Sequence, residues 1–101
     1  MLITAMANNQ FVIDNNNEFI FQSYNTIIVR FDKKTNKMVI NQKFNSSQTT
    51  MRYFLMFINV FLHHEISHEK EVEDFMKNYS KYIKIVSNIE VEVPILNYFN
   101  T

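Results

Sequence analysis

The chain has 101 residues, which we expect to form one domain (residues 1–101) around a single modest core. Lys plus Arg and Asp plus Glu number 10 each, so the formal charge is zero, unlike that of most non-specific nucleic-acid binders or of an acidic DNA mimic. The absence of Cys excludes disulfides and thiolate metal ligands. The N-terminus has no basic region like that of a signal peptide, and the most apolar stretch, residues 53–62, is too short to span a bilayer. We therefore expect a soluble cytoplasmic protein.

The first half of the chain reads as a meander of three or four antiparallel strands. Apolar runs at Leu2 to Ala7 and Phe11 to Ile13 predict one bent or interrupted strand. β-Branched and aromatic residues then predict two strands, joined by a tight turn at S-Y-N-T, and a third strand after a polar hairpin loop. These three predicted strands are Glu18 to Ser23, Thr26 to Phe31 and Lys37 to Asn41.

The sequence contains no Gly, so positive φ angles should fall to Asn or Asp, the next most tolerant residues. The predicted turn residues are Asn15, Asn16, Asn17, Asn25, Asn36 and Asn45. At the S-Y-N-T turn, this reasoning places Asn25 in the left-handed conformation.

The second half of the chain changes to helical spacing. Residues 50–62 predict a helix that Thr49 or Thr50 can cap and that is apolar nearly all round. Such a helix is buried on more than one side, and we expect its second side to support a homodimer. A second helix, capped by Ser67, should carry an apolar face from Val72 to Ile83, with Glu near its start and Lys near its end.

A closing strand is predicted at Ile89 to Val93, where apolar and acidic residues alternate until Pro94. The fold class that follows is α+β. We expect an antiparallel sheet of four or five strands with two helices packed on one face.

The segment H-E-I-S-H at residues 64–68 matches H-E-x-x-H, in which two His on one helix bind zinc and the Glu between them is the general base. The roles would fall to His64, His68 and Glu65. A third ligand is missing from the extended pattern, which would need His at Asp74; candidates elsewhere are Glu71, Glu73 and Glu90. Ser67 as an N-cap would also divide the motif between two helices. We interpret it as a polar inter-helix turn, and a metal-binding His cluster and a metalloprotease remain the alternatives.

Two further surfaces are candidates for binding a partner. One is the hairpin of Tyr24 and Asn25, whose simpler interpretation is turn chemistry. The other is the acidic run HEKEVED, which could meet a basic surface on a nucleic-acid-handling protein. Its acidic residues are Glu69, Glu71, Glu73 and Asp74.

Two other clusters have simpler interpretations. Ser46, Ser47, Thr49 and Thr50 look like nucleophiles, but capping explains them better because no His is near them in sequence. A diffuse basic patch around the polar hairpin is weak support for nucleic-acid binding. It comprises Arg30, Lys33, Lys34, Lys37 and Lys43.

The segment from Glu18 to Leu62 holds a strand ending in F-x-S-Y-N-T, an aromatic residue, a Ser/Thr-rich turn with T-T, and an amphipathic helix. The residues are Phe21, Ser23, Tyr24, Asn25, Thr26, Phe44, Ser46 or Ser47, Thr49, Thr50 and the helix containing Leu55. In this pattern the chain resembles short uncharacterised proteins encoded by phages, plasmids and other mobile elements of low-GC bacteria. Phe44 stands where that family usually has Trp. The resemblance covers less than half of the chain and implies a mobile-element origin without implying catalytic residues.

These observations predict a small non-enzymatic, phage-type inhibitor with no cofactor. It would bind a bacterial defence protein, such as a CRISPR effector nuclease, by surface complementarity in the manner of an anti-CRISPR protein. The alternatives are a zinc-dependent hydrolase that uses residues 64–68 and a nucleic-acid-binding regulator that uses the basic hairpin. We expect no membrane partner and no direct contact with nucleic acid.

Overall fold

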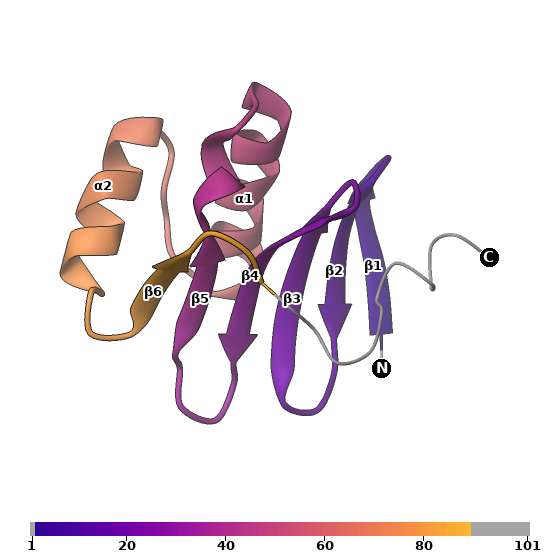
Figure 1. Ribbon diagram of the computed structural model, residues 1–101, viewed down its shortest axis with the longest axis horizontal. Coiled ribbons are helices and arrows are strands. Elements are labelled where there is room, and N and C mark those ends of the chain that lie inside the picture. The colour runs from indigo at the N-terminus through magenta and orange to yellow at the C-terminus, as the bar shows by residue number, and fades with distance from the viewer. Residues whose placement is uncertain (1, 90–101) are drawn as a thin grey trace.

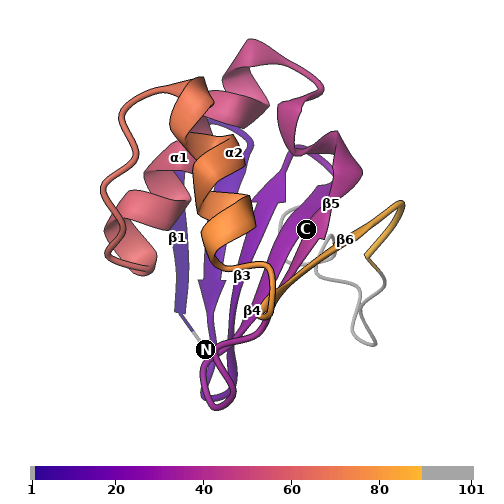
Figure 2. The same cartoon turned by 90° about the vertical axis from the view of Figure 1, so that its left-hand side faces the viewer.

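The computed structural model describes residues 2–89, which form a six-stranded sheet with two helices on one face (Figures 1 and 2). The elements are β1 (Leu2–Ala7), β2 (Gln10–Asp14), β3 (Glu18–Ser23), β4 (Thr26–Asp32), β5 (Met38–Asn41), the 3₁₀ helix η1 (Gln42–Asn45), α1 (Gln48–Phe61), α2 (Glu69–Asn78) and β6 (Ile83–Val86). The α+β class is confirmed, and the sheet has more strands than predicted. No helix within residues 2–89 is both long and apolar enough to cross a membrane.

The strands lie in chain order across the sheet, from β1 to β6. Strands β1 to β5 pair antiparallel, as their short connections allow, whereas β6 pairs parallel with β5. A parallel pair needs a long crossover, and η1, α1 and α2 supply it between β5 and β6. The sheet is therefore mixed, which differs from the antiparallel sheet that the sequence predicts.

Three predicted elements differ from the structure. The run predicted as one interrupted strand forms two, β1 and β2, joined by a turn in which Asn9 has a φ of 62°. The second helix ends at Asn78, and Ile83 belongs to β6 instead. Of the closing strand predicted at 89–93, Ile89 is buried outside any strand, and residues 90–93 lie outside the described part of the chain.

The main core fills the space between the sheet and the helices. Alternate strand residues point to this side, because successive side chains of a strand face opposite ways. The Phe21 ring of β3 stacks on Phe57 of α1 at 5.8 Å, and Phe57 stacks on Phe61 at 5.7 Å. From α2, Val72 and Phe75 close the same cluster. This aromatic layer fixes both helices over one face.

The second side of α1 is largely covered within the molecule. Leu55 and Phe61 pack against the main core, while Met56 and Val60 stay exposed at 36% and 56%. The helix that looks apolar all round is therefore covered partly by its own domain. A homodimer through α1 stays a prediction, and Met56 and Val60 are the side chains it would use.

The other face of the sheet carries a smaller apolar cluster. Ile13, Ile20 and Ile27 form it with Ile89, which follows β6 along the chain. Beside this cluster, Arg30 of β4 pairs with Glu18 of β3 through two nitrogen–oxygen contacts of 2.7 and 2.9 Å. Both faces of the central strands are thus occupied, which explains why their residues form nearly continuous apolar runs.

Candidate functional site

The H-E-I-S-H motif lies between the helices, because α1 ends at Phe61 and α2 begins at Glu69. His63 takes a left-handed conformation with φ 58°, and the His64 backbone N–H then donates to the Ile58 carbonyl at 3.3 Å. His is one of the residue types enriched in this conformation, and here it ends α1 without a glycine. The predicted break inside the motif is confirmed, so His64 and His68 do not share a helical face.

The centre of the motif is a core anchor. Ile66 is only 5% exposed and belongs to the main core. The side-chain amide of Asn59 on α1 donates to the Ile66 carbonyl at 2.8 Å, and its oxygen accepts from the Ile66 N–H at 2.7 Å. This pair of hydrogen bonds holds the loop of residues 62–68 against α1.

The rest of the motif belongs to the start of α2. The N-cap is His68, not Ser67, and its side chain makes no capping hydrogen bond among the residues that the structure describes. Glu71 reaches back instead, and its carboxylate accepts from the Ser67 N–H at 2.9 Å. Glu65 and His68 are exposed, and no group of three His, Asp or Glu within residues 2–89 could hold a metal ion. The proposed ligand Glu90 lies outside the described residues.

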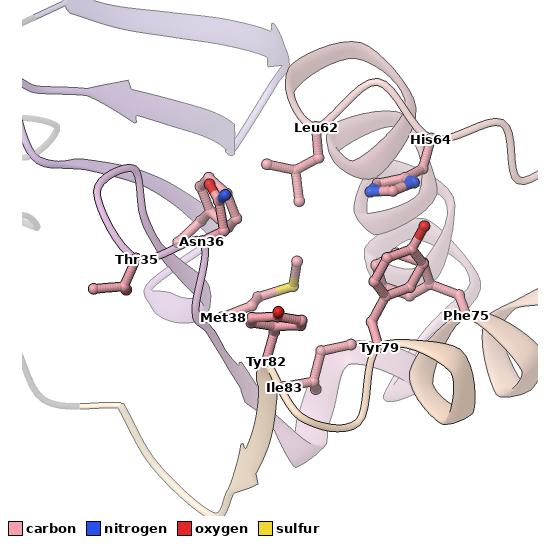
Figure 3. Close-up of a pocket in the computed structure, with 10 residues that line it drawn as sticks. Thr35, Asn36, Met38, Leu62, His64, Phe75, Tyr79, Tyr82 and Ile83 are labelled. Atoms are coloured by element: carbon pink, nitrogen blue, oxygen red, sulfur yellow. The ribbon is translucent and has the colours of Figure 1, made fainter.

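His64 is the one residue of the motif among the described lining of a pocket of about 510 Å³ (Figure 3). Its ring lies 4.9 Å from that of Tyr79 and 5.2 Å from that of Phe75, edge to face in both cases. The pocket lies between the β4–β5 loop, the end of α1, the end of α2 and the start of β6. Its lining residues are Phe31, Thr35, Asn36, Met38, Leu62, His64, Phe75, Tyr79, Tyr82 and Ile83.

The pocket combines an apolar wall with a few polar groups, and none of the described residues that line it is Lys, Arg, Asp or Glu. Its polar groups are the hydroxyls of Tyr79 and Tyr82, the Asn36 amide, the Thr35 hydroxyl and the His64 imidazole (Figure 3). Apolar concave sites with a few convergent polar groups are typical of ligand-binding pockets. Sequence reasoning placed Tyr79 and Tyr82 on a helix face and so missed them as pocket residues.

At the opposite end of the strands, Tyr24 forms the tip of the β3–β4 hairpin. It has a φ of 53° and is 52% exposed. The left-handed residue of this turn is therefore Tyr24, and the prediction that Asn25 would take that conformation is wrong. Asn25 is exposed beside it. A bulky residue with positive φ is a genuine outlier, because its Cβ crowds the following carbonyl.

Two hydrogen bonds hold Tyr24 in this conformation. Its backbone N–H donates to the Asn9 carbonyl at 2.6 Å, and its carbonyl accepts from the Gln22 side-chain amide at 2.8 Å. Next to the tip of the hairpin, the Ser23 and Thr50 hydroxyls are 3.1 Å apart and buried. The hairpin is thus fixed to a second hairpin and to the start of α1.

The acidic α2 residues and the Tyr24 hairpin lie on either side of η1. Lys43 of η1 lines a small pocket with Tyr24, and Phe44 lines another with Glu73. Glu73 and Asp74 are exposed, whereas Glu71 is engaged with Ser67. The side chain of Glu69 lies outside what the structure describes. The two surfaces predicted to bind a partner therefore flank a common 3₁₀ helix.

The Ser/Thr cluster caps α1, as the sequence favours, but the capping residue differs from the predicted one. Ser47, not Thr49 or Thr50, is the N-cap of α1, and its hydroxyl accepts from the Thr50 N–H at 3.0 Å. Thr50 is buried in the first turn of the helix.

The predicted basic patch has fewer basic side chains available for a ligand than the sequence suggests. Besides the Arg30–Glu18 pair, the Lys33 ammonium pairs with Asp14, donates to the Asn15 carbonyl at 2.7 Å and lies 4.4 Å from the centre of the Phe19 ring. These intramolecular partners compete with phosphate for two of the five basic side chains.

Residues 3–74 match a protein-family model described as a family of unknown function, DUF8033. The chain belongs to this family. The match includes Tyr24 and His64 and ends within α2, before Tyr79. No curated protein and no solved structure matches the chain. Membership of this family therefore assigns no activity to the chain, and its function has to be argued from its own residues.

Proposed function

We propose that this protein is a small non-enzymatic inhibitor that binds a bacterial defence protein, such as a CRISPR effector nuclease, in the bacterial cytoplasm. The observation that carries the proposal is Tyr24, an exposed aromatic side chain held in an unfavourable backbone conformation at a hairpin tip. Strain of this kind persists only where the surrounding structure enforces it, and it is often associated with function. Tyr is also among the residues that most often dominate protein–protein interfaces.

The surroundings of Tyr24 support a role as a pre-organised anchor. Because hydrogen bonds to Asn9 and Gln22 fix its backbone, little freedom is lost when its ring enters a partner's pocket. Beyond η1, Glu73 and Asp74 provide exposed negative charge for a basic surface of the kind that nucleic-acid-handling proteins carry. The aromatic anchor would supply affinity, and the acidic residues would orient the partner.

The two alternatives have less support. A zinc hydrolase of the H-E-x-x-H type needs both His on one helix, whereas His64 follows α1 and His68 precedes α2. A nucleic-acid-binding regulator needs free basic residues, whereas Arg30 and Lys33 are ion-paired within the domain.

The test is capture of a partner from a lysate of a low-GC bacterium that carries a CRISPR system, using tagged wild-type protein and the Tyr24→Asn variant. We expect the wild type to capture a nuclease at fixed stoichiometry and to inhibit its cleavage of DNA in a purified assay. The Tyr24→Asn variant should lose at least about tenfold in affinity, as is typical when an aromatic anchor is removed.

Tyr82→Asn is the matched control, because Tyr82 is also an exposed tyrosine, at 49%, but lies outside the hairpin. It should capture the nuclease as well as the wild type does. Equal capture by the wild type and by Tyr24→Asn, or capture of proteins with no role in defence, would contradict the proposal.

A further inference from the structure

A second site, separate from the Tyr24 surface, is the pocket beside His64. We propose that this pocket binds a small, uncharged, planar aromatic molecule that donates a hydrogen bond to the His64 imidazole. This inference goes beyond the proposed function and does not depend on it, because it uses different residues at the other end of the strands.

The shape and size of the pocket favour a small molecule. Its volume of about 510 Å³ falls within the range of typical small-ligand sites. Four separate segments of the chain contribute to its wall, so a ligand would be surrounded on several sides (Figure 3). A partner protein more often meets a flatter surface, on which the exposed Tyr24 hairpin is a better anchor.

The chemistry of the lining selects an aromatic ligand. Phe75, Tyr79 and Tyr82 present rings, and aromatic pairs gain additional energy from edge-to-face and offset-stacked contacts. Tyr79 and Tyr82 are 40% and 49% exposed, so a bound ring would remove apolar surface from water. Met38 and Ile83 add apolar surface to the wall beside them (Figure 3).

The charge of the lining selects an uncharged ligand. Among residues 2–89, an anion or cation in this pocket would lose water without meeting a lining residue of opposite formal charge, which is costly in an apolar site. Free phosphate esters and acidic metabolites are therefore poor candidates, and so are amines.

His64 supplies the directional contact. Its imidazole packs against two rings and makes no hydrogen bond within residues 2–89, and Figure 3 shows one ring nitrogen directed toward the interior of the pocket. A neutral imidazole has one donor and one acceptor nitrogen. With the acceptor facing the pocket, the ring can accept a hydrogen bond from an aromatic N–H or O–H.

The test uses indole and 1-methylindole, which share a ring system but differ in the N–H. Backbone amide resonances of the full-length protein are followed by NMR as each probe is added. We expect saturable shifts at Asn36, His64, Tyr79 and Tyr82, with a dissociation constant for indole of about 1 mM or tighter. Indole should bind about 2- to 10-fold more tightly than 1-methylindole, the range expected for one net hydrogen bond. Benzoate and benzylammonium should bind at least about tenfold more weakly than indole.

The variant His64→Phe keeps the ring contacts and removes the nitrogen. It should still bind both indoles, and the preference for indole should disappear. Tyr82→Asn should weaken both probes equally, and Tyr24→Asn should bind them as the wild type does. No saturable shift in the wild type, or an indole preference that survives in His64→Phe, would overturn the proposal. It would also be overturned if the pocket amides shift only when a captured protein partner is added.

Discussion

The backbone N–H of Tyr24 donates to the carbonyl of Asn9 at 2.6 Å, which joins the tips of two neighbouring hairpins. Both residues have left-handed backbones, with φ angles of 53° and 62°. Asn tolerates this conformation well, and Tyr does not. Since Asn25 follows Tyr24 directly, the strained position is occupied by the less suitable of two adjacent residues, and the hydrogen bond from Tyr24 to Asn9 keeps it there.

Replacing Tyr24 with Asn should therefore stabilise the domain while weakening its interaction with a partner. Relief of the left-handed strain should raise the free energy of unfolding by up to about 1–2 kcal/mol, because the Tyr ring is half exposed and contributes little burial. Urea denaturation followed by circular dichroism measures this change. A decrease in the midpoint would show that the Tyr side chain is needed for folding, and the argument for a strained binding residue would be lost.

Gln10 is fully buried, and neither its side-chain nitrogen nor its side-chain oxygen has a hydrogen-bond partner in the described part of the chain. Burying an amide in this way costs about 1–3 kcal/mol. The substitution Gln10→Met, which is similar in volume and has no polar amide, should raise the free energy of unfolding by a similar amount.

Gln22 provides the matched control for this prediction. It is equally buried and lies on the neighbouring strand, but its amide nitrogen donates to the Tyr24 carbonyl. Gln22→Met removes that bond, so it should stabilise the domain less than Gln10→Met or destabilise it. Equal stabilisation by both variants in urea titrations would mean that the hydrogen bond to Tyr24 contributes nothing.

Asn59 holds the loop that carries His64. Substitution by Leu removes both hydrogen bonds to Ile66, which leaves two backbone groups of the loop without these partners. We expect a loss of about 1–3 kcal/mol in stability, together with faster hydrogen exchange at the Ile66 amide. Asn78→Leu, at an exposed position, should leave exchange in the loop unchanged. Unaltered protection of Ile66 in Asn59→Leu would show that packing alone holds the loop.

Phe57 has no exposed surface, and it stacks on Phe21 of the sheet and Phe61 of its own helix. Phe57→Ala should lower the free energy of unfolding by about 3–5 kcal/mol, since it leaves a cavity in the aromatic layer. Val60→Ala, on the exposed side of the same helix, should change stability by less than about 0.5 kcal/mol. Thermal unfolding of the two variants distinguishes the buried from the exposed side of α1.

The Asp32 carboxylate accepts backbone hydrogen bonds from Lys34 at 2.8 Å and Thr35 at 3.2 Å, at the start of the β4–β5 loop. These bonds, chiefly that from Thr35, hold the pKa of Asp32 below its ordinary value. A depressed carboxyl pKa means that its stabilisation is complete above the unfolded-state pKa and is lost as the pH falls through the folded-state value.

The loop should therefore loosen at acid pH, and with it the side of the pocket that Thr35 and Asn36 form. NMR titration of the Thr35 amide measures this transition. Asp32→Ala should remove the pH dependence and leave the loop loose at neutral pH. A Thr35 amide that titrates identically in Asp32→Ala would contradict this origin.

Strong local patterns were read correctly from the sequence. The three apolar segments that became β3, β4 and β5 and the helix over residues 50–62 were predicted within a few residues of their observed bounds. The polar break in the motif at 64–68 was predicted too. In each case the signal lies in neighbouring residues, so no distant contact was needed to read it.

The secondary structure of short apolar segments could not be predicted from neighbouring residues alone. The run I-K-I-V at Ile83–Val86 continues the apolar face of the preceding helix in sequence, yet it forms β6 because the edge of β5 is free to pair with it. The residues of β5 that pair with β6 lie 45 positions earlier in the chain, as in the pair Met38 and Ile83, so a local sequence pattern cannot reveal that edge. Propensity of a four-residue segment is weak, and pairing overrides it.

Sequence patterns were sufficient to predict the α+β class, the order of the main strands and helices, and the aromatic residue at the hairpin tip. Three features could be seen only in the folded chain: which residue of that hairpin is strained, which His lines a pocket, and which residue of the 64–68 motif is buried. These features depend on groups far apart in the chain. A hydrogen bond to Asn9 holds the Tyr24 backbone, and core packing buries Ile66. The His64 ring packs against Tyr79, which follows α2. Local pattern determines an element, whereas contacts across the fold determine what its side chains can do.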